Sequence, residues 1–263
     1  RDFLRRFCRF GGTMRKSLQS LFILFFWLGL WQAASMLVGQ ELLIPSPLTV
    51  FYRLLALGQT TYFWCSIAAT LLRILVGYLL GIVIGTLLGA LTWRFGFARR
   101  LLHPLLMIVR STPVSSFIIL VLLWIATDLV PVFISLLMVL GIFWQNIFEG
   151  LDSLDHDLLE MTQVYRFSFS QRLRAFYLPS LRPFFSSAAL ASLGLAWKSG
   201  VAAEVLCHPK FSMGKALYNA KIYLETSDLF AWTAMVILLS MLLEKLVRRL
   251  FTSSAQKEVY SKI

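Results

Sequence analysis

The residues best placed to do chemistry form one polar segment, residues 149–183, in a chain that is otherwise strongly apolar. Nine of its residues are Asp, Glu or Arg, although only 14% of the chain is charged. It lies between two apolar runs of membrane-spanning length, and its charges alternate with apolar residues and turn signals. That pattern is too ordered for a simple connector, so we expect the segment to dock a partner.

A second set of candidate residues lies inside the apolar runs, where charged and hydrogen-bonding side chains are expensive. This set consists of Arg110, Ser111, Thr112, Asn146, Lys198 and Glu204. A helix over 101–109 rises roughly 13 Å and places Arg110 near the bilayer middle, where a charge costs about 2.5–3.5 kcal/mol. Because Pro113 also breaks the helix there, the pattern is typical of a transporter site at a discontinuous helix. The alternative is an Arg that pairs with backbone carbonyls and serves packing alone.

The charges of the fifth apolar run cannot neutralise each other along their own helix. Lys198 and Glu204 are six residues apart, about 120° around a helix, so each needs another partner or a water-filled lumen. A cationic lumen formed by Arg110, Lys198 and Arg73 would suit an anionic solute. The alternative is that Arg73 and Lys198 snorkel to the interface or form structural pairs.

Catalytic and metal chemistry finds little support in the residue pattern. The three cysteines are scattered, without metal spacing or a disulfide framework. The three histidines fall on separate segments, and no phosphate-binding loop of the GxxxxGK[ST] kind is present. We therefore expect no enzyme activity, no metal and no cofactor bound by this chain.

The elements that must position these residues are transmembrane helices, because the chain is 58% hydrophobic with a mean hydropathy of +0.74. Runs of about 20 apolar residues match the bilayer core, and they lack the alternation of barrel strands. We expect an all-α integral membrane protein with six transmembrane helices. They are predicted at 17–39, 66–92, 101–127, 129–147, 183–207 and 228–250.

The basic residues favour one orientation of these spans. With a cytosolic N-terminus, 18 of the 25 Lys and Arg residues fall in inside segments, against four in outside segments. The inside segments are 1–16, 93–100, 148–182 and 245–263. This predicts that both termini are cytosolic, with a basic arm at 1–16, a membrane domain at 17–250 and a tail at 251–263. The net charge of +12 therefore indicates topology and contact with anionic lipid, and no nucleic-acid partner is expected.

Two local patterns predict features of the chain between the first two spans and along the second. Pro45 and Pro47 break the chain after the first run, and 48–63 is expected to form a short helix at the outer surface. Glycines spaced by four place a small-residue ridge on one face of the second span, which lets another helix approach closely in lipid. They are Gly77, Gly81, Gly85 and Gly89.

Within the polar segment the pattern predicts two helices. Ser153 can cap the first, with acidic residues near its positive end. Its apolar stripe consists of Leu154, Leu158, Met161 and Tyr165. Ser168 and Gln171 match a capping box for the second helix, which is expected to stop before Pro179. The two helices either act as a lever against the bundle or lie on the lipid headgroups as an amphipathic pair.

This segment resembles the cytoplasmic signature loop of binding-protein-dependent ABC importer permeases. In that family a Glu-Ala-Ala triplet is followed after three residues by Gly, and after nine more by an Ile-x-Leu-Pro-like end. Here the register gives Glu160-Met161-Thr162, Arg166 at the glycine position, and Phe176-Tyr177-Leu178-Pro179. The spacing fits in full, while Met161, Thr162, Arg166 and Phe176 depart from the residue types. If the turn needs a positive φ, Arg166 costs on the order of 1 kcal/mol, or the turn adopts another geometry.

Other motifs, in order along residues 20–250, look like the nitrate/sulfonate/taurine branch of these permeases. They are Ile44-Pro45-Ser46-Pro47, Thr70-Leu71-Leu72-Arg73, Arg110-Ser111-Thr112-Pro113, Gly194-Leu195-Ala196-Trp197-Lys198 through Ala203-Glu204, and Ala231-Trp232. That branch includes importers of sulfonates, taurine, nitrate, thiamine precursors and other small solutes. The resemblance therefore implies a small anionic or heterocyclic solute without naming it.

The resemblance implies the type I ABC importer permease fold in a bacterial inner membrane. Two permease copies would enclose the pathway, two ATP-binding subunits would dock beneath and hold ATP and Mg²⁺, and an extracytoplasmic binding protein would deliver solute. The coupling loop would be 149–182, with its coupling helix at 153–166. The residues implied to contact the ATPase or shape the loop are Leu158, Glu160, Met161, Thr162, Tyr165, Arg166 and Pro179.

Other classes of membrane protein need features that are weak here. A secondary transporter needs intramembrane carboxylates for ion coupling. The predicted spans have none apart from Glu204 and Asp128, which lie near the outer surface. A membrane-embedded enzyme needs a His, Asp or metal constellation facing one leaflet. An energy-coupling subunit of vitamin importers also has paired coupling helices, but its Ala-Arg-Gly-type signatures are absent.

Overall fold

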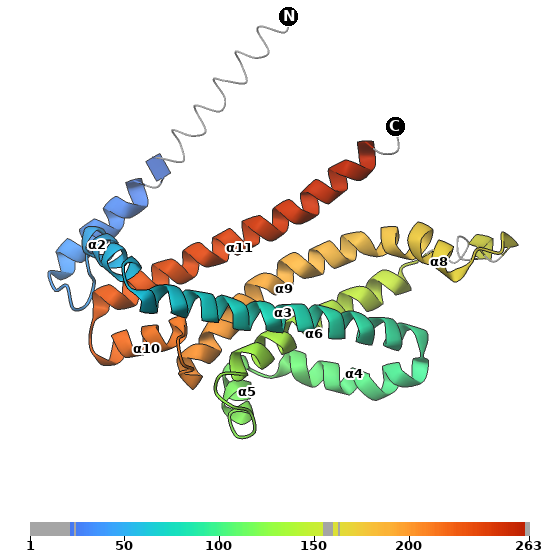
Figure 1. Cartoon of the computed structure of the whole chain (residues 1–263), viewed down its shortest axis with the longest axis horizontal. Coiled ribbons are helices and arrows are strands. Elements are labelled where there is room, and N and C mark those ends of the chain that lie inside the picture. Colours follow the sequence, from blue (N-terminus) through green and yellow to red (C-terminus); the bar gives the residue numbers. More distant parts are fainter. Residues whose placement is uncertain (1–21, 24, 155–159, 163, 261–263) are drawn as a thin grey trace, which may run out of the picture.

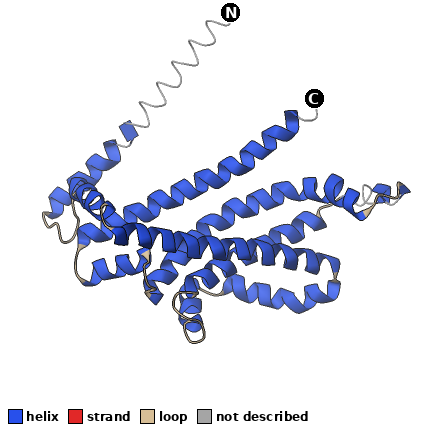
Figure 2. Cartoon of the chain, in the orientation of Figure 1, coloured by secondary structure: helices blue, strands red, loops and turns tan. Residues whose placement is uncertain are grey.

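The computed structural model describes residues 22–23, 25–154, 160–162 and 164–260, with Phe169 and the last ten of these described by backbone alone. In this part of the chain every regular element is a helix and no strand occurs (Figure 2). The predicted all-α fold is confirmed.

The long helices lie along one another and form a multi-pass bundle (Figure 1). Four of them are long and apolar enough to cross a membrane: α3 (Thr61–Arg94), α6 (Val130–Asp152), the helix Ser170–Cys207 and the Thr226–Leu250 part of α11. A bent pair, α4 (Gly96–Ser111) and α5 (Val114–Val121), makes a fifth if it is one span. The count of six is not confirmed. The first predicted span, 17–39, lies partly outside the described residues, and its described helix is Phe25–Val38.

The predicted break of the third span is confirmed, and it is sharp. Helices α4 and α5 meet at an angle of 106°. Thr112 and Pro113 have extended backbones between the two helices, because a proline disfavours the helical conformation of the residue before it. The hydroxyl and the backbone N–H of Thr112 both donate to the Ile108 carbonyl, at 2.7 and 3.1 Å, and close α4. The polar residues at the break thus end α4.

The glycine ridge of α3 packs closely against another helix, as predicted, and that helix is α6. A Cβ atom on Gly81 would lie 2.6 Å from the Cβ of Val139, and one on Gly85 would lie 2.7 Å from the Cβ of Phe143. A Cβ on Gly89 would lie 2.9 Å from the Cβ of Ile147. Because real Cβ atoms do not approach so closely, only glycine lets these helix backbones pack at this distance. This contact holds the centre of the bundle together.

Two short helices gather at the end of the bundle where α3 begins, which we call the α10 end (Figure 1). Helix α2 (Pro47–Gly58) begins at Ser46, whose hydroxyl accepts from the Thr49 N–H. It confirms the predicted short helix, although a new helix starts at Thr61. Helix α10 (Met213–Ile222) begins at Ser212 in the same way. The α10 end is therefore built from well-capped helices and short turns.

The polar segment lies at the opposite end, which we call the segment end, and two boundaries there differ from prediction (Figure 1). Helix α6 continues to Asp152, so the segment begins inside it. The second predicted helix does not stop before Pro179. It starts as α8 (Phe169–Arg172), passes through the π-helical turn η1 (Leu173–Tyr177) and continues as α9 (Leu178–Cys207).

The π-turn explains why Pro179 is tolerated. Proline removes one backbone donor and crowds the carbonyl four residues before it. In η1 the Leu178 N–H instead donates five residues back, to the Leu173 carbonyl, and this wider turn relieves the crowding. The prediction treated Pro179 as a stop, but the chain continues past it within a 38-residue helix.

Candidate functional sites

The tip of the polar segment is a left-handed turn at Arg166, which has φ of 53°. The Phe167 N–H donates to the Thr162 carbonyl at 3.0 Å, and the Tyr165 N–H donates to the Met161 carbonyl at 3.0 Å. The bond across five residues is the signature of a Schellman helix end, whose left-handed position is usually glycine. Arg166 occupies that position. The turn therefore keeps the geometry expected for glycine, at the cost of left-handed strain on an arginine.

The next helix begins immediately after this turn, with the predicted capping box. The Ser168 N–H donates to Gln171 Oε1 at 2.8 Å, and the Gln171 N–H donates to Ser168 Oγ at 3.4 Å. Arg172 Nε donates to the Phe167 carbonyl at 3.0 Å. These bonds fix a sharp corner between the helical residues before Arg166 and the long helix that leads into the bundle.

The corner exposes apolar side chains that a soluble surface would bury. Met161 is 48% exposed, Val164 79% and Tyr165 69%, whereas Thr162 is 4% exposed. Leu154, predicted on the same stripe as Met161 and Tyr165, is only 7% exposed and therefore buried. The stripe is thus divided between the bundle and the surface. Leu158 lies outside the described residues.

The other predicted coupling residues have separate places. Glu160 is exposed and helical. Pro179 lies in the first turn of α9. Ser153, the predicted N-cap, is the residue after α6, and its hydroxyl donates to the Gly150 carbonyl at 3.0 Å. The residues whose N–H groups it was expected to cap, 155 and 156, lie outside the described residues.

The six polar residues predicted within the spans do not form one cluster. Arg110 and Ser111 are exposed at the end of α4, and Lys198 is exposed on α9. Asn146, half-buried on α6, donates to the Ile142 carbonyl at 2.9 Å. In the described residues no ion pair joins Arg110 or Lys198 to a carboxylate. These two cations therefore face outward from this single chain. The stem of Arg110 packs beside α6, because a Cβ atom on Gly141 would lie 3.5 Å from Arg110 Cγ.

Glu204 is different, because its side chain is 0% exposed and fully engaged. Its carboxylate accepts from the Thr70 hydroxyl at 2.8 Å, from the Gly214 N–H at 3.2 Å and from Arg73 Nη1 at 3.2 Å. These bonds join α3, α9 and α10. Glu204 is therefore buried inside the α10 end and does not line an open surface.

Arg73 links this buried carboxylate to a second, exposed one. Its guanidinium donates to Asp128 Oδ1 at 3.2 Å, and to the carbonyls of Lys210 and Phe211 at 2.7 and 3.0 Å. The structural pairing left open for Arg73 is thus observed, whereas the role of Asp128 as its partner was missed. Two features of the sequence pointed to this pairing. Arg73 is a charge within an apolar run, and the carboxylates Asp128 and Glu204 have no partner of opposite charge within reach on the same predicted helix.

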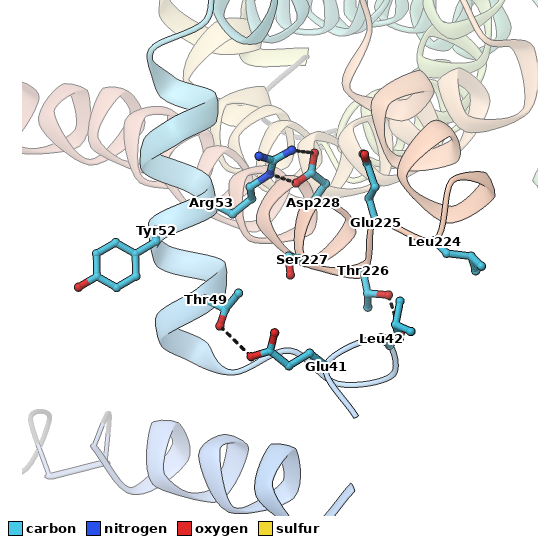
Figure 3. A pocket seen from close by; sticks show the side chains of 10 residues that line it. All are labelled: Glu41, Leu42, Thr49, Tyr52, Arg53, Leu224, Glu225, Thr226, Ser227 and Asp228. Atoms are coloured by element: carbon cyan, nitrogen blue, oxygen red, sulfur yellow. Dashed lines mark hydrogen bonds and ion pairs between the residues drawn. The ribbon is translucent and has the colours of Figure 1, made fainter. Parts of the chain in front are cut away.

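A cavity of about 680 Å³ opens beside α2 at the same end (Figure 3). It is lined by Glu41, Leu42, Thr49, Tyr52, Arg53, Leu224, Glu225, Thr226, Ser227 and Asp228. Arg53 forms a two-pronged pair with Asp228, which holds α2 against the start of α11; the Nη2–Oδ2 distance is 3.0 Å. The hydrogen bond to Asp228 raises the pKa of the Arg53 guanidinium. The cavity was not predicted from the sequence.

A family model described as "Binding-protein-dependent transport system inner membrane component" matches residues 77–257, which is more than half of the chain. The match begins at the first glycine of the ridge, includes the whole polar segment and ends in α11. It covers both ends of the bundle.

Individual relatives agree with the family match. The chain is 30% identical over 232 residues to a putative aliphatic sulfonates transport permease protein, SsuC, of Escherichia coli (strain K12), covering 86% of this chain and 83% of that protein. The Bacillus subtilis (strain 168) protein of the same name is 27% identical over 230 residues, 85% and 81% of the two chains. The formylaminopyrimidine transport permease protein ThiX of Halalkalibacterium halodurans is 27% identical over 187 residues, 70% and 74% of the two chains.

The helical bundle, the ordered corner of the polar segment and these similarities agree. The chain belongs to the binding-protein-dependent transport system inner membrane components, as a multi-pass ABC importer permease of the sulfonate-type branch.

Proposed function

We propose that this permease forms the solute pathway of an ATP-driven importer and is driven by a separate ATPase that docks on residues 153–179. The observation that carries the proposal is the rigid corner at Arg166. It presents Met161, Val164 and Tyr165 to solvent on a turn that hydrogen bonds fix from both sides. Exposed apolar and aromatic side chains on a fixed turn are typical anchors of a protein interface.

The segment end is then cytosolic, with both termini on that side, and the α10 end faces the extracytoplasmic binding protein. This orientation is supported by the excess of Lys and Arg in the segments assigned to the inside. Two ATP-binding subunits would dock beneath two copies of this chain, and they would bind and hydrolyse ATP with Mg²⁺.

Motion of the docked corner would reach the membrane through the helix Ser170–Cys207. This helix is continuous from the corner to the α10 end despite Pro179. When ATP closes the ATPase pair, Tyr165 and Met161 would move with it, and α9 would carry the displacement through the bundle. Further contacts to the ATPase would come from Glu160, Leu158 and Arg166. Thr162, which is only 4% exposed, would anchor the tip to the chain itself.

The solute pathway would lie where Arg110 and Lys198 face outward from this chain, enclosed by a second copy, so the pair is most simply a homodimer. Ser111 and Thr112 mark the break beside Arg110, and Asn146 lies on the neighbouring α6. A cationic lining favours a small anionic solute such as a sulfonate, taurine or nitrate, with a thiamine precursor-like heterocycle as the second candidate. The buried Glu204 would support this pathway from behind.

Secondary transport without an ATPase is the competing function. It needs an intramembrane carboxylate that exchanges protons or sodium with solvent. Of the two carboxylates named for this role, Glu204 is 0% exposed and bound by three donors, and Asp128 lies in the α5–α6 loop, paired with Arg73. The structure thus favours the ATP-driven importer.

The test is reconstitution of the permease with an ATPase and a binding protein in lipid vesicles. We expect the ATPase to co-purify with the permease, and solute-loaded binding protein to stimulate both ATP hydrolysis and uptake. Replacing Arg110 and Lys198 together with Gln should reduce uptake of an alkanesulfonate more than uptake of a formylaminopyrimidine. Uptake by this chain alone, driven by a proton or sodium gradient, would overturn the proposal.

A further inference from the structure

Arg73 holds two carboxylates that differ in how firmly they are bound. The Arg73 side chain is 15% exposed, while Glu204 is 0% exposed and Asp128 is 58% exposed. One guanidinium nitrogen, Nη1, faces Glu204, and the other, Nη2, faces Asp128. The same cation thus has a buried side and a side that is open to solvent at the α10 end.

The buried side is held by several hydrogen bonds. Glu204 is satisfied by Thr70 and Gly214 in addition to Arg73. Gly214 packs so tightly on Glu204 that a Cβ atom on it would overlap the Glu204 side chain. Losing this carboxylate would leave buried donors unpaired, which is costly. Arg73 is therefore held in place whether or not Asp128 is bound.

The open side is a small anion cradle. Arg73 Nη2 and the Lys210 N–H both donate to Asp128 Oδ1, each at 3.2 Å. A guanidinium beside a backbone N–H is a donor set suited to carboxylate, sulfonate or phosphate oxygens. Asp128 occupies it from the loop between α5 and α6, which has no regular helix over 122–129. Among the described residues, Asp128 is the side chain that fills the cradle.

We propose that this cradle is a binding site for a small soluble anion, and that Asp128 is its exchangeable internal ligand. An anion that binds Arg73 Nη2 and the Lys210 N–H displaces Asp128 and releases the α5–α6 loop. The exchange keeps one negative group on Arg73, so the buried Arg73–Glu204 pair is undisturbed. If the α10 end is extracytoplasmic, as the proposed import function requires, the cradle is an entry site for solute. Only this role as an entry site rests on the proposed function; the binding of an anion does not.

The first test measures anion binding to the full chain in phosphatidylcholine nanodiscs, without ATPase or binding protein. Ethanesulfonate is the probe and dimethyl sulfone is its neutral match. Removing the competing carboxylate in Asp128→Ala, or neutralising it in Asp128→Asn, should tighten ethanesulfonate binding at least tenfold. The matched control is Asp228→Ala, which breaks the other arginine–aspartate pair of this end and should bind like the parent. Equal affinity in the parent and both Asp128 variants would overturn the proposal.

The second test follows the loop while Asp128 is intact. Thr127→Cys, in a chain whose three native cysteines are replaced by Ser, carries an environment-sensitive fluorophore. Ethanesulfonate should shift its emission saturably, and the sulfone should not. In Thr127→Cys with Asp128→Ala, the emission should already be shifted and should not respond. Binding without any emission change in the Asp128 parent would show that the anion does not displace Asp128, and would overturn the exchange.

The lipid composition separates two sources of anion. An emission shift caused by phosphatidylglycerol nanodiscs alone would assign the cradle to a lipid phosphate and overturn its assignment to a soluble solute. Neither binding test requires uptake. A chain that binds ethanesulfonate but shows no ATP-driven uptake would therefore contradict the proposed function and leave the anion site standing.

Discussion

The two ends of the bundle use polar residues in opposite ways. At the α10 end, Arg73, Glu204 and Thr70 satisfy one another inside the chain. At the segment end, hydrogen bonds fix the backbone of the corner, while Met161 and Tyr165 stay exposed. The polar groups of one end are satisfied within the chain, whereas the other end presents exposed apolar side chains on a fixed turn. The comparison assigns the stabilising polar network to the first end and, under the proposed function, ATPase docking to the second.

The long helices join the two ends through one packed core. The glycine ridge of α3 holds α6 at a distance that no larger residue permits. Two α6 residues beside this ridge also contact α9: the Ser135 hydroxyl donates to the Ala196 carbonyl, and Phe143 contacts Phe185 edge-on. The core between the ends is therefore tightly packed. Under the proposed function, such a core would transmit a displacement of the corner instead of absorbing it.

The largest predicted effect is on folding, at the α10 end. Glu204→Ala leaves Arg73, the Thr70 hydroxyl and the Gly214 N–H without their shared acceptor, and should destabilise the protein by about 3–5 kcal/mol. The cross-end control, Glu160→Ala, removes an exposed carboxylate and should change stability by less than about 0.5 kcal/mol. Thermal unfolding in detergent measures both variants. Equal stabilities would contradict the division between the two ends.

The next effect is on binding, at the segment end. Tyr165→Ala removes a 69% exposed ring from the corner and should leave folding intact. Loss of an interface anchor costs about 2 kcal/mol, so the affinity for the ATPase should fall roughly thirtyfold. Tyr223, 71% exposed at the α10 end, gives the matched control Tyr223→Ala. Its ATPase affinity should equal that of the parent in a pull-down titration, and a comparable loss there would remove the evidence for docking at the corner.

The bundle could be predicted because its signals are periodic. Long apolar runs predicted the spans, the four-residue glycine spacing predicted a close helix contact on one face of α3, and Pro113 predicted the break. Pro179 misled the prediction because a proline read locally is a stop, whereas a π-turn lets the helix continue past it. That adjustment depends on the backbone geometry of η1, which no residue type announces.

The sites were predictable only in part, for a similar reason. Ser168 and Gln171 predict a local cap and form it. For Glu204, by contrast, the sequence left open another partner or a water-filled lumen, because its partners Thr70, Arg73 and Gly214 lie on two other helices. Which intramembrane charge meets which depends on helix rotation and depth. The chain order alone does not determine these quantities.

A third effect compares a turn that occurs at both ends. Leu224, like Arg166, is a left-handed residue after a helix, with φ of 58°, and the Glu225 N–H donates five residues back to the Ala220 carbonyl. Both positions hold a side chain where glycine is usual. Arg166→Gly and Leu224→Gly should each stabilise the protein by about 1 kcal/mol, because glycine adopts this conformation without steric strain.

The two glycine variants should differ in function. Arg166→Gly also removes a side chain from the proposed ATPase contact, so it should weaken ATPase binding, whereas Leu224→Gly should not. Thermal unfolding and the same pull-down titration separate the two effects. If both variants bind the ATPase like the parent, Arg166 serves only the turn.

The smallest effect concerns the pair that holds α2 at the α10 end. Arg53 is 45% exposed and Asp228 11% exposed. After Asp228→Asn, water can solvate the freed guanidinium, which distinguishes it from the guanidinium of Arg73 at 15% exposure. The loss should therefore be at most about 1 kcal/mol, and it should shrink further in 1 M salt, where the Debye length is about 3 Å. Unfolding temperatures of Asp228→Asn and the parent, compared at low and high salt, measure this loss. A salt-independent loss as large as that of Glu204→Ala would show that the α10 end is held together at its rim as strongly as at its buried centre.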